Sequence, residues 1–350
     1  MRQPTSCSSA AKPQAKVWKY DQTFFAVFPD VTGTYIWQLE ERQWHKHLLL
    51  SQKVNSQADC FAHMDTVFIL LFQGEDSESA VVWYRQDKER YQFIDDANPT
   101  TDIQFHESTE TATIALDGLV WLWVTYEANG NIEVRRSAPP YDQWSAPQTI
   151  ASMVADDDIS ALVRMPNAVG VMWSNQRARQ FGFRTHSDGD PMTTWTGTEF
   201  PGIDDALDVG HGLADDHINL KSLADGTIYA AVKTSFDTAN HTKIGLLIRN
   251  PQGVWNDLYH VSHHGTRPMV TIDTLSQTLR VYYTHSESGG NIVYKASPLN
   301  NISFGAEQMF MEGSMNNNVT STNFAYSCEN VVLASDKKDI ISKQIRCSYH

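Results

Sequence analysis

Asn131-Ile-Glu-Val-Arg-Arg-Ser137, which runs on to Trp144, is the end of a unit that recurs along the whole chain. Other copies include Gln180-Phe-Gly-Phe-Arg-Thr185 and Lys243-Ile-Gly-Leu-Leu-Ile-Arg249, each followed by a Trp. In most copies, two runs of β-branched and aromatic residues precede this third run, as expected for successive strands. A period of about 45–50 residues built from strands is typical of a β-propeller.

The repeat predicts an all-β fold, a seven-bladed β-propeller that forms one domain over residues 17–350. Six or eight blades also fit the pattern, because the first and last blades can share strands to close the ring. Residues 1–16 are rich in Ser, Ala and Lys and lack the periodicity, so they are predicted to be a flexible leader. The expected blades span 17–50, 55–95, 105–150, 157–200, 213–262, 265–310 and 316–349.

The overall charge of the chain is acidic, with 27 Lys and Arg against 41 Asp and Glu and a formal net charge of −14. Nucleic acid is therefore not an expected partner, because phosphate binding needs a basic surface. No apolar run reaches the length of about 18 residues that a membrane helix needs, so we expect no membrane insertion. No apolar signal-peptide core is visible either. The oligomeric state stays open.

Two of the four cysteines bear on the cellular compartment. Cys328 and Cys347 flank a predicted hairpin, and their midpoint coincides with that of its Asp336–Asp339 turn. They should face each other across an antiparallel pair, within disulfide reach; two free core thiols are the alternative. A disulfide favours an oxidising compartment and hence an extracellular or secreted protein. Spacing leaves the pairing of Cys7 with Cys60 open.

Polar segments lead into the expected innermost strands of four consecutive blades, so they should converge on one rim of the central axis. The segment Asp215-Asp-His217-Ile-Asn-Leu-Lys221 is the most informative. Strand alternation places His217, Asn219 and Lys221 on one face of its strand and apolar residues on the other. Such a polar row on an innermost strand favours a functional site over packing alone. The four segments are Asp156–Asp158, Asp215–His217, Gly265–Arg267 and Asn316–Asn318.

These polar residues also have structural interpretations. The Asp residues can cap turns by accepting hydrogen bonds from backbone N–H groups, and His217 can bridge two blades. Further candidates lie at the ends of the second strands, where a Trp can stack on a sugar and amides can bind hydroxyls. Burial between blades is the commoner role of a propeller Trp, and exposure in a loop is the simpler interpretation of His285. These further candidates are Trp173, Asn175, Gln176, Lys233, Tyr283 and His285.

Metal binding has little support in the sequence. The chain contains no Cys-x-x-Cys pair and no His-x-x-x-His pattern on a predicted helix. The spacing of its Asp residues matches no calcium-binding loop. We therefore expect no cofactor and no metal site, while a structural Ca²⁺ stays open.

Asp215-Asp-His217, the Asp225-Gly turn and the strand that ends at Lys233 resemble the sialidase-like, BNR-repeat propellers. Within them the chain is most similar to the group with propeller ulvan lyases and related rhamnosidases. The resemblance implies a carbohydrate substrate and places His217 at the position of the family's catalytic His. The second strand of that family usually ends in another His, where this chain has Lys233. Clear Ser-x-Asp-x-Gly-x-Thr-Trp boxes and the Arg triad of true sialidases are missing, so sialidase activity is not expected.

Together these features predict a carbohydrate-active propeller that acts on an acidic polysaccharide through one axial site, as a lyase that performs β-elimination at a uronic acid. The reaction needs a cation beside the carboxylate, a base for the C5 proton and an acid for the leaving oxygen. The expected roles are base for His217, cation for Arg267, Lys221 or Lys233, and proton donor for Tyr283 or Tyr229. The expected substrate contacts are Asp158, Asp216, Asn219, Trp173, Asn175, Gln176, Asn318 and His285.

Two other functions stay open. A glycoside hydrolase would use two carboxylates across the sugar, for which Asp158 and Asp216 are the candidates. A non-catalytic glycan-binding lectin would instead carry similar sugar pockets between its blades, built on aromatic residues. Those aromatic candidates are Trp37, Trp83, Trp123 and Trp173. In each case the expected partner is an oligosaccharide or polysaccharide.

Overall fold

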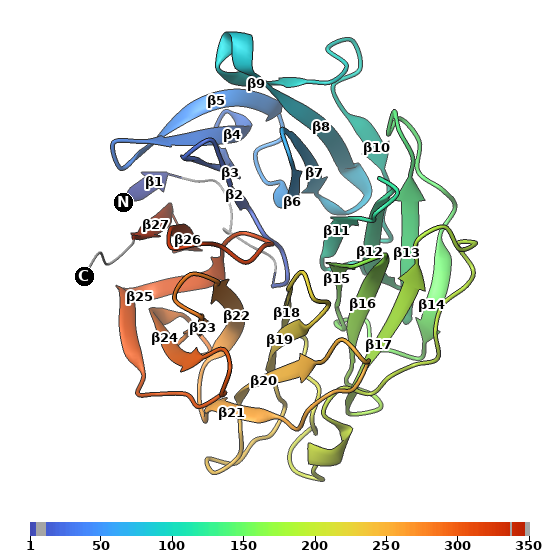
Figure 1. Cartoon of the computed structure of the whole chain (residues 1–350), viewed down its shortest axis with the longest axis vertical. Coiled ribbons are helices and arrows are strands. Elements are labelled where there is room, and N and C mark those ends of the chain that lie inside the picture. Colours follow the sequence, from blue (N-terminus) through green and yellow to red (C-terminus); the bar gives the residue numbers. More distant parts are fainter. Residues whose placement is uncertain (5–11, 337, 347–350) are drawn as a thin grey trace.

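The computed structural model describes residues 1–4, 12–336 and 338–346 of the chain. Its strands form small antiparallel sheets that stand around a central axis as the blades of a propeller (Figure 1). In most blades, strands that follow one another in the sequence are hydrogen-bonded neighbours. The repeat in the sequence thus corresponds to one blade per copy, and the predicted all-β propeller is confirmed.

The strands of each blade have the following bounds. The first blade holds β2 (Val17–Tyr20), β3 (Thr23–Asp30), β4 (Gly33–Glu40) and β5 (Gln43–Ser51). The second holds β6 (Gln57–His63), β7 (Thr66–Phe72), β8 (Ser77–Arg85), β9 (Arg90–Phe93) and β10 (Thr101–Ile103). The third holds β11 (Ala112–Leu116), β12 (Leu122–Ala128), β13 (Asn131–Ser137) and β14 (Gln148–Ser152). The fourth holds β15 (Ser160–Met165), β16 (Ala168–Asn175) and β17 (Gln180–Ser187).

The remaining elements complete the ring. The fifth blade holds β18 (Ile218–Ser222), β19 (Ile228–Lys233), β20 (Ile244–Arg249) and β21 (Tyr259–Ser262). The sixth holds β22 (Thr266–Asp273), β23 (Thr278–Thr284), β24 (Gly290–Pro298) and the first part of β25 (Gln308–Thr320). The seventh holds the rest of β25, then β26 (Asn330–Ser335), β27 (Asp339–Ile345) and β1 (Arg2–Pro4). Short 3₁₀ helices are η1 (Gly74–Asp76), η2 (Gln86–Lys88) and η3 (Ile203–Asp205).

Strand β25 belongs to two blades. Its earlier residues pair with β24, where Gly290 lies opposite Asn316, and its later residues pair with β26, where Asn317 lies opposite Ser335. One strand is therefore the outer edge of the sixth blade and the innermost strand of the seventh. The six sheets in the described part of the chain accordingly make seven blades, the predicted number.

Residues 1–4 and 12–16, which the sequence assigned to a flexible leader, are part of the propeller in the structure. Strand β1 pairs with β27 as the outermost strand of the seventh blade, with Arg2 opposite Ile341. Gln14, Ala15 and Lys16 are at most 2% exposed and lie at the axis. The Gln14 side chain donates to the backbone of Ala112, and the Ala15 N–H donates to Asp59. These bonds hold a segment that has no repeat of its own.

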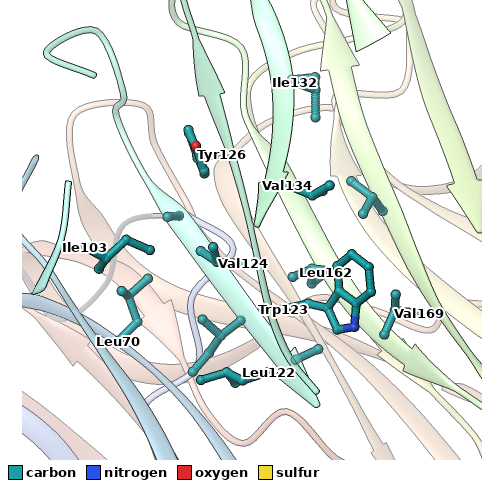
Figure 2. Close-up of a cluster of buried hydrophobic side chains, with 14 of the residues drawn as sticks. Leu70, Ile103, Leu122, Trp123, Val124, Tyr126, Ile132, Val134, Leu162 and Val169 are labelled. Carbon is teal, nitrogen blue, oxygen red and sulfur yellow. The ribbon is translucent and has the colours of Figure 1, made fainter. Parts of the chain in front are cut away.

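The hydrophobic core lies between neighbouring blades. In β12, Leu122, Val124 and Tyr126 point toward Leu70 and Ile103 of the second blade (Figure 2). The alternate residue Trp123 points the other way, toward Leu162 and Val169 of the fourth blade (Figure 2). All seven residues of β12 are buried. Because both faces of such a sheet are covered, its strands show continuous apolar runs rather than alternation.

The C-terminal hairpin has the register that the sequence predicts, with Ser335 of β26 opposite Ile340 of β27. Cys347 lies outside the described residues, so the predicted Cys328–Cys347 disulfide stays a prediction. Cys7 also lies outside them, and Cys60 is a buried free thiol. No helix in the described ranges is long and apolar enough to cross a membrane.

Candidate axial active site

His217 lies immediately before β18, the innermost strand of the fifth blade, and is 6% exposed. Its Nδ1 atom is 2.7 Å from Asp215 Oδ1 and 2.6 Å from Asp216 Oδ1. Because an ionised carboxylate only accepts hydrogen bonds, Nδ1 carries a proton and Nε2 of the neutral ring is left as the acceptor. Nε2 lies 3.5 Å from Oγ1 of Thr266, the first residue of β22. The ring thus sits between two blades with its basic nitrogen fixed in direction.

Each carboxylate beside His217 is also held by a cation. Asp215 Oδ2 is 3.4 Å from Lys233 Nζ and accepts a 3.1 Å hydrogen bond from Ser235. Asp216 Oδ2 accepts a short hydrogen bond from the ammonium of Lys12. Burial opposes ionisation of Asp216, but its bond to His217 and the charge of Lys12 hold its pKa well below the usual range. Asp216 is therefore held in its ionised form, and the two carboxylates together keep the imidazole in place.

Lys12 is a site residue that the sequence does not reveal. Its side chain is 8% exposed, and its ammonium also lies 2.6 Å from Glu110 Oε2, before the third blade. The sequence around Lys12 has no strand pattern, and its partners are about a hundred or more residues away. Only the folded ring brings this cation to the start of β18.

Arg267 and Asn318 occupy similar positions in successive innermost strands. Both have left-handed backbones, with φ angles of 52° and 54°. Arg267 lies at a register shift near the start of β22, and Asn318 lies at one where β25 pairs with β26 of the seventh blade. Irregularities of this kind often re-aim side chains next to functional sites. Arg267 is half-buried, and its side chain forms no hydrogen bond or ion pair with any other described residue. Within the described part of the chain it is thus a cation without a side-chain partner, one residue beyond the Thr266 that faces His217.

Asn219 and Lys221 lie further along β18, deep in the axis. The amide oxygen of Asn219 accepts a hydrogen bond from the backbone N–H of Val270, and Lys221 Nζ donates to the backbone of Leu220. Burial lowers the pKa of Lys221 to about 8, although the charge of Asp59 opposes this shift. Asn219 thus joins β18 to β22, whereas Lys221 bonds within β18. Neither residue contacts His217 within the described structure.

Asp59 is the buried carboxylate of this deep axis. Its two oxygens accept 2.7 Å hydrogen bonds from the backbone of Ala15 and of Ile114. Burial raises its pKa to about 7, even though these bonds and the charges of Lys16 and Lys221 favour the ionised form. Asp59 is not recognisable in the sequence as a site residue, because a single Asp inside an apolar strand gives no signal of an axial position.

Several predicted contacts have structural roles instead. Asp158 is 1% exposed and accepts hydrogen bonds from the backbone of Ala155 and Gln176, so it caps a loop. Burial raises its pKa, and these bonds oppose the rise. The ring of Trp173 is buried between blades and packs directly over Gly182. Asn175 accepts the N–H of Ala178 in a turn. Asp158 and Trp173, two of the predicted sugar contacts, are thus buried and engaged by other residues of the fold.

The two predicted tyrosine acids do not contact His217. Tyr283 is fully buried and donates a 2.6 Å hydrogen bond to Glu307, in a second cluster that also holds His285. Burial and the negative charge of Glu307 raise the pKa of Tyr283. Tyr229 lies in the core between the fifth and sixth blades. Alternation along a strand does not tell which neighbour an inward side chain meets, so the sequence could not place these tyrosines relative to His217.

Most of the Trp residues that could stack on a sugar in a lectin are buried. Trp37, Trp123 and Trp173 are at most 4% exposed, and Trp83 alone of the four reaches 36%. A cavity of about 680 Å³ lies at the opposite ends of the innermost strands, beside Trp18 and Phe324. No His lines it. Among the described residues, the candidate catalytic and ligand-binding side chains therefore lie around His217 and around Glu307.

No family model and no curated protein sequence matches this chain. Several solved structures do match it in fold. A polysaccharide lyase, Uly1, superimposes with a TM-score of 0.54 at 9% identity, over 97% of this chain and 91% of its own. An α-L-arabinanase of Penicillium chrysogenum, complexed with arabinobiose, gives 0.53 at 8%, over 86% and 99%. A protein from Lactobacillus plantarum gives 0.56 at 14%, over 89% and 85%. At these identities, what the chain shares with them is the fold.

Proposed function

We propose that this protein is a carbohydrate-active enzyme that cleaves an acidic polysaccharide by β-elimination at a uronic acid. The observation that carries the proposal is the geometry of His217, whose Nδ1 is held by the carboxylates of Asp215 and Asp216 while Nε2 is left to accept a proton. A fixed, oriented imidazole is what a general base requires.

The proposed reaction uses His217 and Arg267, the residue after the Thr266 that lies 3.5 Å from this imidazole. His217 Nε2 takes the C5 proton, the C5 electrons form the C4–C5 double bond, and the bond from C4 to the leaving oxygen breaks. Arg267 neutralises the uronate carboxylate, which stabilises the charge that develops as C5 loses its proton. No tyrosine among the described residues contacts His217, so the same imidazole returns its proton to the leaving oxygen. That sequence suits a syn elimination, in which both groups leave from one face.

The structural neighbours support carbohydrate chemistry without choosing the reaction. Uly1 is described as a polysaccharide lyase, and the fungal neighbour is an arabinanase. Hydrolysis by two carboxylates receives less support from this chain, because Asp158 is engaged by backbone N–H groups and is buried. Extracellular location, which fits a polysaccharide substrate, is part of the same proposal.

The test is product formation from a panel of alginate, pectate, hyaluronan, chondroitin sulfate and an ulvan. Ultraviolet absorbance reports the conjugated double bond of an elimination product, and a reducing-sugar assay reports every cleaved linkage. The proposal expects both signals to rise together on at least one polymer. Reducing ends without absorbance would mean hydrolysis, and binding without either signal would mean a lectin; both results would overturn the proposal.

A further inference from the structure

A second group of chemically active side chains lies outside the axial site, on the sixth blade. His264 is in the loop between β21 and β22, His285 directly follows β23, and Glu307 directly precedes β25. Three segments of one blade therefore meet at the end where β22 begins. This is the same end as His217, because the loop of His285 also carries Glu287, which pairs with Lys233. We refer to His264, His285 and Glu307 as the rim cluster.

The rim cluster brings three potential ligand atoms together. His264 Nε2 lies 3.0 Å from Glu307 Oε2, and His285 Nδ1 lies 3.2 Å from Glu307 Oε1. All three residues offer a ligand atom within 4.8 Å of the others. Bonds of about 2.1 Å around a tetrahedral metal ion place neighbouring ligand atoms about 3.4 Å apart. The spacing in the structure is close to this value, so a metal requires only small side-chain rotations.

The surroundings of the cluster orient its ligands. Tyr283, which is fully buried, donates a 2.6 Å hydrogen bond to Glu307 Oε2. His264 has its other ring nitrogen, Nδ1, 3.5 Å from Ser262 Oγ, which leaves Nε2 directed at Glu307. Support of this kind from outside the ligand set is typical of metal sites, where it fixes both ring direction and ligand basicity.

The cluster is also open enough to admit an ion. The side chains of His264 and His285 are 50% and 48% exposed, and that of Glu307 is 27% exposed. An exposed His–Glu pair contributes little to stability, so folding alone gives no strong reason to converge two imidazoles on one carboxylate. Two neutral imidazoles and one carboxylate leave a single negative charge, which suits a divalent cation.

We propose that the rim cluster is a zinc site, with His264 Nε2, His285 Nδ1 and the Glu307 carboxylate as protein ligands and water in the remaining position. Two His and one carboxylate with an open fourth position is a ligand set that Zn²⁺ takes up in proteins. Nitrogen donors also disfavour Ca²⁺ and Mg²⁺, which prefer oxygen ligands. The proposal is independent of the axial chemistry, because none of its ligands contacts His217.

The experiment measures zinc bound to the whole protein by equilibrium dialysis against ZnCl₂ and elemental analysis. The wild type should bind one Zn²⁺, and H264A, H285A and E307Q should each weaken binding at least about tenfold, since second-shell losses alone reach that size. H263A is the matched control. His263 is the next residue in the same loop, it stacks on His260 outside the cluster, and its loss should leave zinc binding unchanged.

Two further measurements show whether zinc binds at the rim cluster itself. Co²⁺ should give the visible absorption of a tetrahedral site in the wild type and in H263A, and lose it in H264A. Zinc should raise the Tm of the wild type but not of H264A, because only bound metal stabilises the folded state. Absence of zinc binding at about 100 μM, or equal binding by H264A, H285A and E307Q, would overturn the proposal; so would loss of binding in H263A.

Discussion

The ammonium of Lys12 bonds to the carboxylate of Asp216, 204 residues further along the chain. This contact joins the N-terminal segment to the residue that precedes His217. It adds a positive charge beside the candidate base and keeps Asp216 ionised. The N-terminal segment is therefore part of the candidate site as well as part of the ring closure.

Replacement of Lys12 by Met should lower kcat/KM on the responsive polysaccharide at least about tenfold, or about 1.4 kcal/mol. The reason is that the site loses a cation and Asp216 loses the partner that stabilises its charge. K46M is the matched control, because Lys46 forms a 2.6 Å pair with Asp30 on the first blade. Equal or higher activity in K12M would contradict this role.

Asp215 should matter through the orientation of His217. Substitution of Asp215 by Asn places an amide where the carboxylate accepts the Nδ1 proton, so the ring can turn or change tautomer. We expect kcat to fall about a hundredfold while KM changes little, since Asp215 does not bind the substrate itself. Steady-state kinetics separates the two parameters. A rise in KM at constant kcat would contradict a positioning role.

Two substitutions of Arg267 separate the effect of its charge on activity from the effect of its backbone strain on stability. Both R267A and R267G remove the cation, so both should lower kcat/KM by about tenfold or more. A left-handed φ of 52° is costly for Ala and not for Gly, so R267G should be about 1 kcal/mol more stable than R267A. Kinetics and urea unfolding measure the two effects. Full activity in both variants would remove Arg267 from the proposed mechanism.

Asp59 should make stability depend on pH. Burial raises its folded-state pKa from 3.8 to about 7, so the folded protein retains a proton that the unfolded chain releases. Its stabilising contribution is fully present below the unfolded pKa and is lost as pH rises toward 7, by up to about 4 kcal/mol. Lys221, with a pKa of about 8, stays charged in both states over this window.

Urea unfolding followed by Trp fluorescence at several pH values between about 4.5 and about 7.5 measures this effect. D59N should have a flatter dependence of unfolding free energy on pH than the wild type. D65N, which changes an exposed carboxyl on the same blade, should keep the wild-type dependence. Parallel curves for the wild type and D59N would contradict the assignment.

The fold could be predicted from the repeat because each unit of sequence forms one blade. Every blade packs against two neighbouring blades, so each unit needs the same pattern of apolar strands. The repeat also predicted that segments leading into innermost strands converge, and Thr266 does meet His217 across two blades. Lys12 could not be predicted, because its partners lie far away in the sequence and its segment has no period. Residue type alone also left Trp173 and Asp158 ambiguous, since burial decides between sugar contact and packing.

The most direct test of the central claim is turnover by H217A on the polysaccharide that the wild type cleaves, followed by ultraviolet absorbance. H45A, which replaces an exposed His on the first blade, is the control. We expect H217A to lose at least about a thousandfold in kcat, within the range of a lost general base that also serves as acid, while circular dichroism and Tm stay close to the wild type. H217A with near-normal absorbance gain and an intact fold would contradict the assignment of His217 as the base.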